Sequence, residues 1–378
     1  RSYDIVIKSA VPLTFGSAID VDDDLTLTAG TLDVSATLYG ITIGGDWIDT
    51  GAGAFTERTG TVTFDGTGTL NSNEAFNDLT VNSAGTVTLG AALDVDDDLT
   101  LTAGTGDINF NNTTGGATAL GDLLINSAGT VNVNDDFTAK SFAVTTATVF
   151  DSLGFTLNTT GADDTVGGDV DITTTGALSA GSIITTGGVD DSDTIGQNAG
   201  AVTLTSGTVL TTNTITATGS DSDSGDNSGG DGGTVTLTGS TRIDLGGNIN
   251  TSGGSGDSQG SGGTVTFNSP TNLLATRSIT TGDTTGDIIF NQTLDGAAAV
   301  TLTAGTADIT ITGAVGSTAP LTVFTINNAK NVTFGNTIET SGALTQTTGT
   351  GTTTFSDAGT IGGDVNISTD AITFSGAN

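Results

Sequence analysis

The sequence contains no cysteine, no methionine and no histidine, and only 3 of its 378 residues are proline. Without cysteine the chain can form neither a disulfide bond nor a thiolate metal site, which is consistent with a secreted protein that crosses membranes unfolded. Without histidine and cysteine the usual catalytic triads are excluded. The composition therefore predicts a protein that is not an enzyme.

Basic residues are also scarce. Against 42 acidic residues stand 7 lysines and arginines, which gives a formal net charge of −35. These bases are scattered along the chain, at Arg1, Lys8, Arg58, Lys140, Arg242, Arg277 and Lys330. A polysaccharide-acting β-helix enzyme, which would combine aspartates with each other or with a base, is therefore the least favoured alternative. A surface with this much negative charge repels nucleic acid and anionic membranes and attracts cations. We therefore expect no nucleic-acid partner.

Long hydrophobic runs are absent as well. No run of about 18 apolar residues occurs, so the sequence predicts no insertion into a membrane. No signal peptide is evident, and the first residue is an arginine. We therefore expect the chain to be a processed product or an internal segment of a longer protein.

What the sequence has in place of these features is a series of short alternating segments. TVTF (61–64), TVTL (86–89), TVTLT (234–238) and ITIT (309–312) place an apolar residue at every second position. A period of two predicts strands with one buried face, and β-branched threonine suits the exposed face of a pleated sheet. Glycine, asparagine, aspartate and serine fill the gaps, and no stretch shows the period of a helix.

These segments belong to internal repeats. VPLTFGSAIDVDDDLTLTAGT (11–31) returns as GTVTLGAALDVDDDLTLTAGT (85–105), and DLTVNSAGTVTL (78–89) returns as DLLINSAGTVNV (122–133). A repeat of this size cannot bury its inward face alone, but stacked repeats bury a continuous column of apolar side chains. The sequence therefore predicts an all-β protein with the fold of a parallel, right-handed β-helix, or β-solenoid.

We expect about 16–20 coils, stacked at the spacing of neighbouring strands, in one continuous solenoid over residues 12–378. Residues 1–11 would form an N-terminal strand that caps the solenoid or pairs with another subunit. Two glycine- and serine-rich segments, 219–233 and 252–263, interrupt the pattern. Because the repeats resume after each, we interpret them as loops at corners of the solenoid and not as linkers between domains.

Three segments have a distinctive amino-acid sequence: DLTVNSAGTVTLG (78–90), GGDVDITTTGAL (167–178) and INTSGGSGDSQGSGGTVTF (249–267). They resemble the repetitive stalks of filamentous-haemagglutinin-like exoproteins, which are large β-helices secreted by bacteria or held at their surface. The resemblance covers nearly everything after residue 11, although the secretion domain of that family is not evident here. It implies an extracellular location at the bacterial cell surface and an adhesive or scaffolding role.

An aspartate stands directly before the apolar start of many expected strands. Asp24 and Asp46 are about one coil apart, and so are Asp78, Asp98 and Asp122, so each group should stack at about 5 Å per coil. Stacked like charges destabilise a sheet, so something must offset them. One alternative is that each carboxylate accepts N–H groups of its own turn.

The other alternative is Ca²⁺ held between carboxylates of adjacent corners. The candidate ligands are Asp20, Asp22, Asp24, Asp46, Asp78, Asp96, Asp98 and Asp122. No other cofactor is expected.

Two structural functions fit this fold. The first is an adhesin stalk or scaffold, a rigid spacer that presents the segments 219–233 and 252–263 to glycans or proteins of a host or neighbouring cell. The second is a subunit of an extracellular fibre or sheath, in which the last coil stacks on the next copy or on the rest of a longer solenoid. The last residues, AITFSGAN, still alternate like an ordinary coil, and YDIVIKSA (3–10) carries one of the few bases, Lys8, toward an acidic neighbour.

Overall fold

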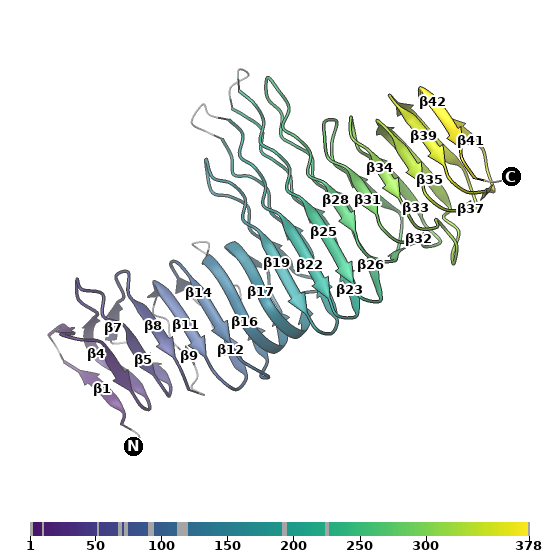
Figure 1. Ribbon diagram of the computed structural model, residues 1–378. Coiled ribbons are helices and arrows are strands. Elements are labelled where there is room, and N and C mark those ends of the chain that lie inside the picture. The colour runs from purple at the N-terminus through teal and green to yellow at the C-terminus, as the bar shows by residue number, and fades with distance from the viewer. Residues whose placement is uncertain are drawn as a thin grey trace. The chain divides into compact units, whose positions relative to one another are not determined.

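The computed structural model describes residues 3–9, 11–50, 53–66, 70–71, 75–89, 94–111, 120–190, 195–223 and 227–376. Within these ranges the secondary structure consists of strands, without a helix, and the strands pair in parallel. Strands pair with the equivalent strands of the preceding and following turns of chain, which is the arrangement of a β-solenoid (Figure 1). The predicted fold class, an all-β parallel β-helix, is therefore confirmed.

The chain forms two compact units. Unit 1 comprises Arg1–Asn158 and Ile172–Thr175, and unit 2 comprises Thr159–Asp171 and Gly176–Asn378. β19 (Val170–Thr174) contributes residues to both. The expectation that residues 12–378 form a single continuous solenoid stays a prediction.

Unit 1 contains short strands separated by turns. In its described residues these are β1 (Ile5–Lys8), β2 (Leu13–Thr14), β3 (Ile19–Val21), β4 (Leu25–Asp33), β5 (Ile41–Ile43), β6 (Trp47–Asp49), β7 (Gly53–Thr56), β8 (Thr61–Phe64), β9 (Leu70–Asn71), β10 (Ala75–Phe76), β11 (Asp78–Asn82), β12 (Val87–Leu89), β13 (Asp94–Val95), β14 (Leu99–Thr102), β15 (Ile108–Phe110), β16 (Leu120–Val133), β17 (Phe137–Asp151) and β18 (Thr156–Asn158).

One column of unit 1 shows why the repeats stack. Strands β3, β5, β8, β11, β14, β16 and β17 pair in register, and the residues that follow one another in the column are Ile19, Ile41, Val62, Leu79, Leu99, Leu123 and Phe142. Consecutive members lie 17–24 residues apart in the sequence, close to the expected coil length. All but the first are buried, because each new rung covers the apolar side chain of the rung before it.

The first strand of unit 1 lies at the edge of this stack. β1 pairs with β4 through Ile5 with Leu25 and Ile7 with Leu27, and Ile7 is buried. Lys8 is exposed. Arg1, the other base expected near this edge, lies outside the described residues.

The strands of unit 2 have two to seven residues and are shorter than β16 and β17 of unit 1. They are β20 (Leu178–Ala180), β21 (Ser182–Ile184), β22 (Val202–Ser206), β23 (Val209–Thr212), β24 (Ile215–Thr216), β25 (Val235–Gly239), β26 (Arg242–Leu245), β27 (Ile249–Asn250), β28 (Val265–Phe267), β29 (Thr271–Leu273), β30 (Arg277–Thr280), β31 (Ile288–Phe290), β32 (Leu294–Asp295), β33 (Ala299–Thr303), β34 (Ile309–Ile311), β35 (Val323–Ala329), β36 (Val332–Phe334), β37 (Ile338–Thr340), β38 (Leu344–Gly349), β39 (Thr352–Phe355), β40 (Gly359–Ile361), β41 (Val365–Ile367) and β42 (Ala371–Phe374).

The strands of unit 2 form three parallel columns. One column runs from β22 through β25, β28, β31, β34, β36 and β39 to β42, and a second runs from β21 through β24, β27, β30, β33, β35 and β38 to β41. The third runs from β20 to β40 and includes Val315 as a single bridging residue. The three inward faces enclose one apolar core, in which aromatic rings stack on equivalent rings: the centroids of Phe267 and Phe290 are 4.3 Å apart.

The early rungs of unit 2 are longer than its later rungs. Val202 pairs with Val235 and Val235 with Val265, so these rungs span 33 and 30 residues, whereas the later rungs of the same column span 19–23. The additional residues form excursions, which we call the glycine arms: residues 159–168, 185–200, 217–233 and 251–263. Figure 1 shows these excursions projecting past the ends of β22 and β25. Residues 191–194 and 224–226 lie outside the described part of the chain.

Each glycine arm is a narrow hairpin that closes at its base. The backbone N–H groups of Gly168, Gly200, Gly233 and Gly263 donate to the carbonyls of Thr159, Thr185, Ala217 and Thr251, respectively, at 2.8–2.9 Å. In three of the four arms the threonine hydroxyl also donates to the carbonyl of the closing glycine. The described residues of the segments predicted as corner loops, 219–233 and 252–263, thus lie within the stacked arms.

The arms stack on one another through backbone hydrogen bonds that repeat every third residue. Four backbone N–H groups of the third arm donate to carbonyls of the fourth arm. The donors and acceptors are Gly219 and Ser252, Ser222 and Ser255, Gly229 and Ser258, and Gly232 and Ser261. Three residues per turn is the period of a polyproline II helix, and no described glycine between 159 and 263 has a positive φ. The described residues of the arms thus stack with the period of a polyproline II helix, except near Asp164 in the first arm, whose φ is 57°.

Glycine is required in the arms because neighbouring backbones touch. A Cβ atom on Gly230 would lie less than 3.0 Å from backbone atoms of Gln197 in the preceding arm. Real Cβ atoms essentially never approach other atoms so closely, and the atoms that this Cβ would meet belong to backbone and not to a flexible side chain that could yield.

We expect Gly230→Ala to disorder the arms while leaving the columns of unit 2 folded. Amide hydrogen exchange should show lost protection at Gly229, Gly232 and the arms on either side, with β25 and β28 still protected. The matched control is Gly16→Ala, since a Cβ there meets nothing within 4 Å. Unchanged protection in the Gly230 variant would contradict the packing described here.

Candidate functional site

The structure stacks the aspartates that precede the strands of unit 1. An Oδ1 atom of Asp24 accepts the backbone N–H of Asp46 at 2.8 Å, and that of Asp98 accepts the N–H of Asp122 at 2.9 Å. The Oδ1 atom of Asp78 likewise accepts the backbone N–H of Asp98, at the longer distance of 3.5 Å. The side chain of Asp122 accepts the hydroxyl of Ser141 at 2.8 Å. The two groups expected from spacing, Asp24 with Asp46 and Asp78 with Asp98 and Asp122, thus lie side by side.

These bonds differ from the turn-capping alternative in one respect. The N–H group that each carboxylate accepts belongs to the next rung and not to the aspartate's own turn. At the residue before a strand, the backbone N–H of the equivalent residue in the next rung is directed toward the rung before it. The aspartate side chain supplies the acceptor there, and we call this bond the inter-rung cap.

The inter-rung cap recurs through both units. Other carboxylates that accept the backbone N–H of the next rung are Asp107 (from Thr130), Asp136 (Thr156), Asp169 (Ala201), Asp221 (Ser255), Asp231 (Ser261), Asp287 (Asp308) and Asp308 (Asn331), at 2.6–3.1 Å. Because the inter-rung cap occurs in both units, its first role is to stabilise the stack of rungs. It explains why aspartate, whose carboxylate sits close to the backbone, outnumbers glutamate in this sequence.

Three of the predicted ligands stand apart from the stacks. Asp20, Asp22 and Asp96 are exposed, and their side chains make no hydrogen bond with any part of the chain that the structure describes. They alternate with buried residues such as Val21 and Val95, so the pleat directs them to solvent. The structure therefore does not bring the eight predicted residues into one site.

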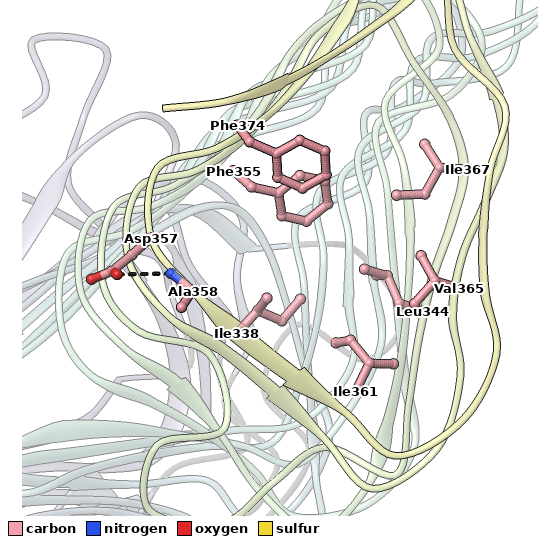
Figure 2. Close-up of a pocket in the computed structure, with 10 residues that line it drawn as sticks. Ile338, Leu344, Phe355, Asp357, Ala358, Ile361, Val365, Ile367 and Phe374 are labelled. Atoms are coloured by element: carbon pink, nitrogen blue, oxygen red, sulfur yellow. Dashed lines mark hydrogen bonds between the residues drawn. The ribbon is translucent and has the colours of Figure 1, made fainter. Parts of the chain in front are cut away.

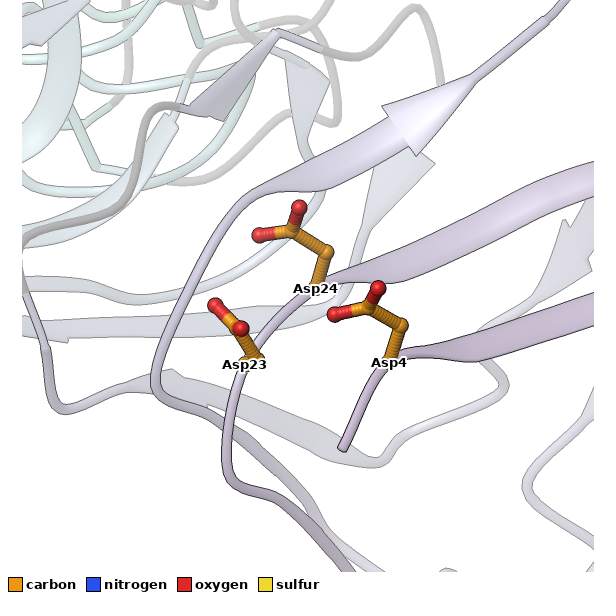
Figure 3. A group of neighbouring side chains, drawn as sticks. All are labelled: Asp4, Asp23 and Asp24. Atoms are coloured by element: carbon orange, nitrogen blue, oxygen red, sulfur yellow. The ribbon is translucent and has the colours of Figure 1, made fainter. Parts of the chain in front are cut away.

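A closer acidic group lies at the first rung of unit 1. Carboxylate oxygens of Asp4, Asp23 and Asp24 lie within 4.8 Å of one another (Figure 3). Desolvation raises the pKa of Asp23, and the charges of Asp24 and Asp4 raise it further. Asp4 and Asp23 were not among the predicted ligands. The sequence rule would have found Asp4, because it stands directly before Ile5.

Among the described residues of unit 1, one ion pair joins a base to a carboxylate. Arg58 donates two hydrogen bonds to the carboxylate of Asp33, at 2.7 and 2.9 Å, and these bonds lower the pKa of Asp33 to about 2. At Asp97 the neighbouring charge of Asp98 and then desolvation raise the pKa. The acidic edge of unit 1 is thus under repulsion that a cation would relieve.

A second candidate surface is the last rung of unit 2. Here an open apolar groove of about 350 Å³ is lined by side chains from β37 to β42 (Figure 2). Phe374 stacks on Phe355 with ring centroids 5.3 Å apart, but the residue is still 77% exposed. Val365 and Ile372 are also exposed. The groove is a cross-section of the core that no further rung covers in this structure.

No protein-family profile, no curated protein and no solved structure matches the chain. The described residues hold no helix with the length and apolarity of a membrane span. The functional reading therefore depends on the fold and on these two surfaces.

We expect the two substitutions of Asp98 to differ. Asp98→Ala removes the acceptor for the Asp122 N–H and should lower the free energy of unfolding of unit 1 by about 1 kcal/mol. Asp98→Asn keeps an oxygen at that place and removes one of several adjacent charges, so it should remain close to the parent protein. Urea unfolding followed by amide exchange in unit 1 measures both, and equal losses for Ala and Asn would show that charge, not capping, matters.

Asp23→Asn should stabilise unit 1 at neutral pH. The pKa of Asp23 is raised on folding, so its charged form opposes folding above that pKa and the opposition disappears as the pH falls through it. The thermal unfolding midpoint of the variant should exceed that of the parent at pH 7 and match it near pH 3. Asp20→Asn, which removes a charge outside the cluster, is the control. An advantage that persists unchanged at low pH would contradict this assignment.

The prediction that Ca²⁺ binds the aspartate corners can be tested directly. At low ionic strength Ca²⁺ should raise the unfolding temperature of unit 1 more than Na⁺ at matched ionic strength, and a chelator should reverse the gain. Asp23→Asn should reduce the Ca²⁺-specific part. If Ca²⁺ and Na⁺ act equally, the ions only screen the repulsion, and the aspartates serve as inter-rung caps alone.

Proposed function

We propose that this chain is a non-catalytic structural part of an extracellular protein at a bacterial cell surface, an adhesin stalk or scaffold of the filamentous-haemagglutinin-like kind. The observation that carries the proposal is the constant register of the column from β22 to β36 in unit 2, where equivalent residues pair from rung to rung. A stack of this kind resists bending because every rung is bonded to the next along three sides. Its lateral face can present arms to glycans or proteins of another cell.

The composition supports an extracellular location. A chain without cysteine is insensitive to the redox state of its surroundings, and a net charge of −35 keeps a long repetitive surface soluble. The groove lined by Thr241, Arg242 and Asp295 supports a role without catalysis. The groove beside Arg242 contains the one basic side chain that an enzyme would use there, but Arg242 is bonded to both carboxylate oxygens of Asp244, at 2.9 and 3.1 Å.

Localisation is the direct test of this proposal. Antibodies against the purified chain should label the outside of intact, unpermeabilised cells of the native source in immunogold electron microscopy. Protease added to such cells should remove the label. Label that is found only after permeabilisation would overturn the proposal.

The second candidate function is that of a fibre subunit, and the open groove of unit 2 favours it. The last rung exposes three strand edges, β40, β41 and β42, and the first rung of unit 1 exposes β1, β2 and β3. Three parallel edges at one end can pair with three at the other end of a second copy. Such head-to-tail contacts produce open filaments.

Phe374→Glu tests the fibre role. A charge in the apolar groove should abolish any filaments or concentration-dependent oligomers that electron microscopy and sedimentation detect for the parent chain. Thr373→Glu, on the alternate side of the same strand, should leave them intact. A parent chain that stays monomeric at high concentration would exclude self-stacking, with the stalk proposal unaffected.

A further inference from the structure

The fourth glycine arm, residues 251–263, has an incomplete neighbour. In the arm before it, the N–H groups of Gly219, Ser222, Gly229 and Gly232 all donate to carbonyls of the fourth arm, at 2.8–3.0 Å. The strand registers, Ile215 with Ile249 and Val235 with Val265, identify the equivalent residues of the fourth arm. They are Gly253, Gly256, Gln259 and Gly262.

Only one of these four donors has a partner in the described structure. The N–H of Gly262 donates to the hydroxyl of Thr284 at 3.1 Å. The corresponding turn of the next rung, residues 281–286, is too short to reach the others, because Gly282 and Gly286 adopt positive φ and reverse the chain. The N–H groups of Gly253, Gly256 and Gln259 make no hydrogen bond with any described residue. We call these three donors the open arm edge.

Thr284 shows that the stack ends here with a cap at its base. Its hydroxyl donates to the carbonyl of Gly260 at 2.8 Å while it accepts the N–H of Gly262. In the third arm the residue equivalent to Gly260 is Gly230, and a backbone group donates to its carbonyl. That donor is the N–H of Gly254. The Thr284 hydroxyl thus takes the place of the missing backbone groups at the base of the fourth arm. Along the open arm edge, no described group takes their place.

We propose that the open arm edge binds a glycine-rich segment of another polypeptide chain in the polyproline II conformation. The chemistry of the occupant is shown by the arms themselves, because the same face of the preceding arm is covered by the glycine-rich segment 251–263. Three residues of polyproline II rise by about 9 Å, so its carbonyls on one side meet every third donor of the edge. A β-strand presents carbonyls on one side about every 7 Å and cannot stay in register.

The edge also selects against ordinary sequences. Within the arms a Cβ on Gly229, Gly254 or Gly260 would lie within 3.0 Å of neighbouring backbone. A partner that lies at the same distance from the fourth arm must lack side chains on its facing side. This inference concerns unit 2 alone and holds wherever the protein is located, so its failure would not affect the proposed structural function.

A peptide tests the proposal on the intact chain. The probe is acetylated and amidated SGGSGDSQGSGG, the sequence of residues 252–263, which covers the equivalent face of the preceding arm. A short peptide must be ordered on binding, so we expect a dissociation constant on the order of 1 mM. In amide NMR spectra the signals of Gly253, Gly256 and Gln259 should shift with peptide concentration, while those of Gly229 and Gly232, which are already bonded, should not.

Two controls make the result decisive. A peptide with every glycine replaced by alanine should cause no shifts. Gln259→Pro removes one donor but is compatible with polyproline II, and it should weaken binding at least threefold, whereas Gln259→Ala keeps the N–H and should bind like the parent. Shifts of equal size with both peptides, or no shifts with the glycine peptide up to about ten times the expected constant, would overturn the proposal. If Gln259→Pro disorders the arm, the comparison of the two peptides on the parent chain still decides.

Discussion

The structure depends on the backbone hydrogen bond from one rung to the next. Within a rung the chain makes few bonds to itself, so almost every peptide group must find its partner about one coil away in the sequence, at distances such as the 22 residues between Asp24 and Asp46. Where strands run in register the backbone supplies both partners. At corners it does not, and there aspartate and asparagine side chains supply the acceptor. In the arms, where backbones pack on backbones, side chains must be absent, and glycine occupies those places. The unusual abundance of aspartate and glycine thus follows from a single requirement.

The stacked aspartates show which of two opposing effects is larger. Two exposed carboxylates about 5 Å apart in a water-like dielectric repel each other by roughly 0.8 kcal/mol, and salt reduces this. A hydrogen bond from a backbone N–H to a charged acceptor contributes about 1.5–3 kcal/mol net. The inter-rung cap therefore outweighs the repulsion at sites such as Asp98, and stability does not require a cation there. At Asp23 the balance differs, because desolvation raises the pKa of its carboxyl and the charges of Asp24 and Asp4 raise it further.

How much could be predicted from the sequence follows from the same chemistry. The alternation in TVTF predicted a strand at 61–64, where β8 lies, and the repeats predicted parallel stacking, because both patterns are local or recur at nearly constant spacing. The spacing of Asp78, Asp98 and Asp122 likewise predicted their stacking. The partner of each carboxylate could not be predicted, since it depends on the register between rungs. The stacking of the described arm residues was also missed: glycine- and serine-rich sequence usually indicates a loop, and a period of three has no apolar residue to mark it.

The arms and the strands expose edges of different selectivity. An open β-edge, like that of β42 with Phe374, offers donors, acceptors and apolar surface, and any extended apolar strand can pair with it. A polyproline II edge lacks apolar surface and excludes any chain whose facing residues carry a Cβ, so sequences of ordinary composition are rejected by contact with backbone. A protein can therefore expose Gly253, Gly256 and Gln259 to a crowded medium with little risk of unspecific association. The specificity of such an edge comes from what it excludes, because each of its few hydrogen bonds is individually weak.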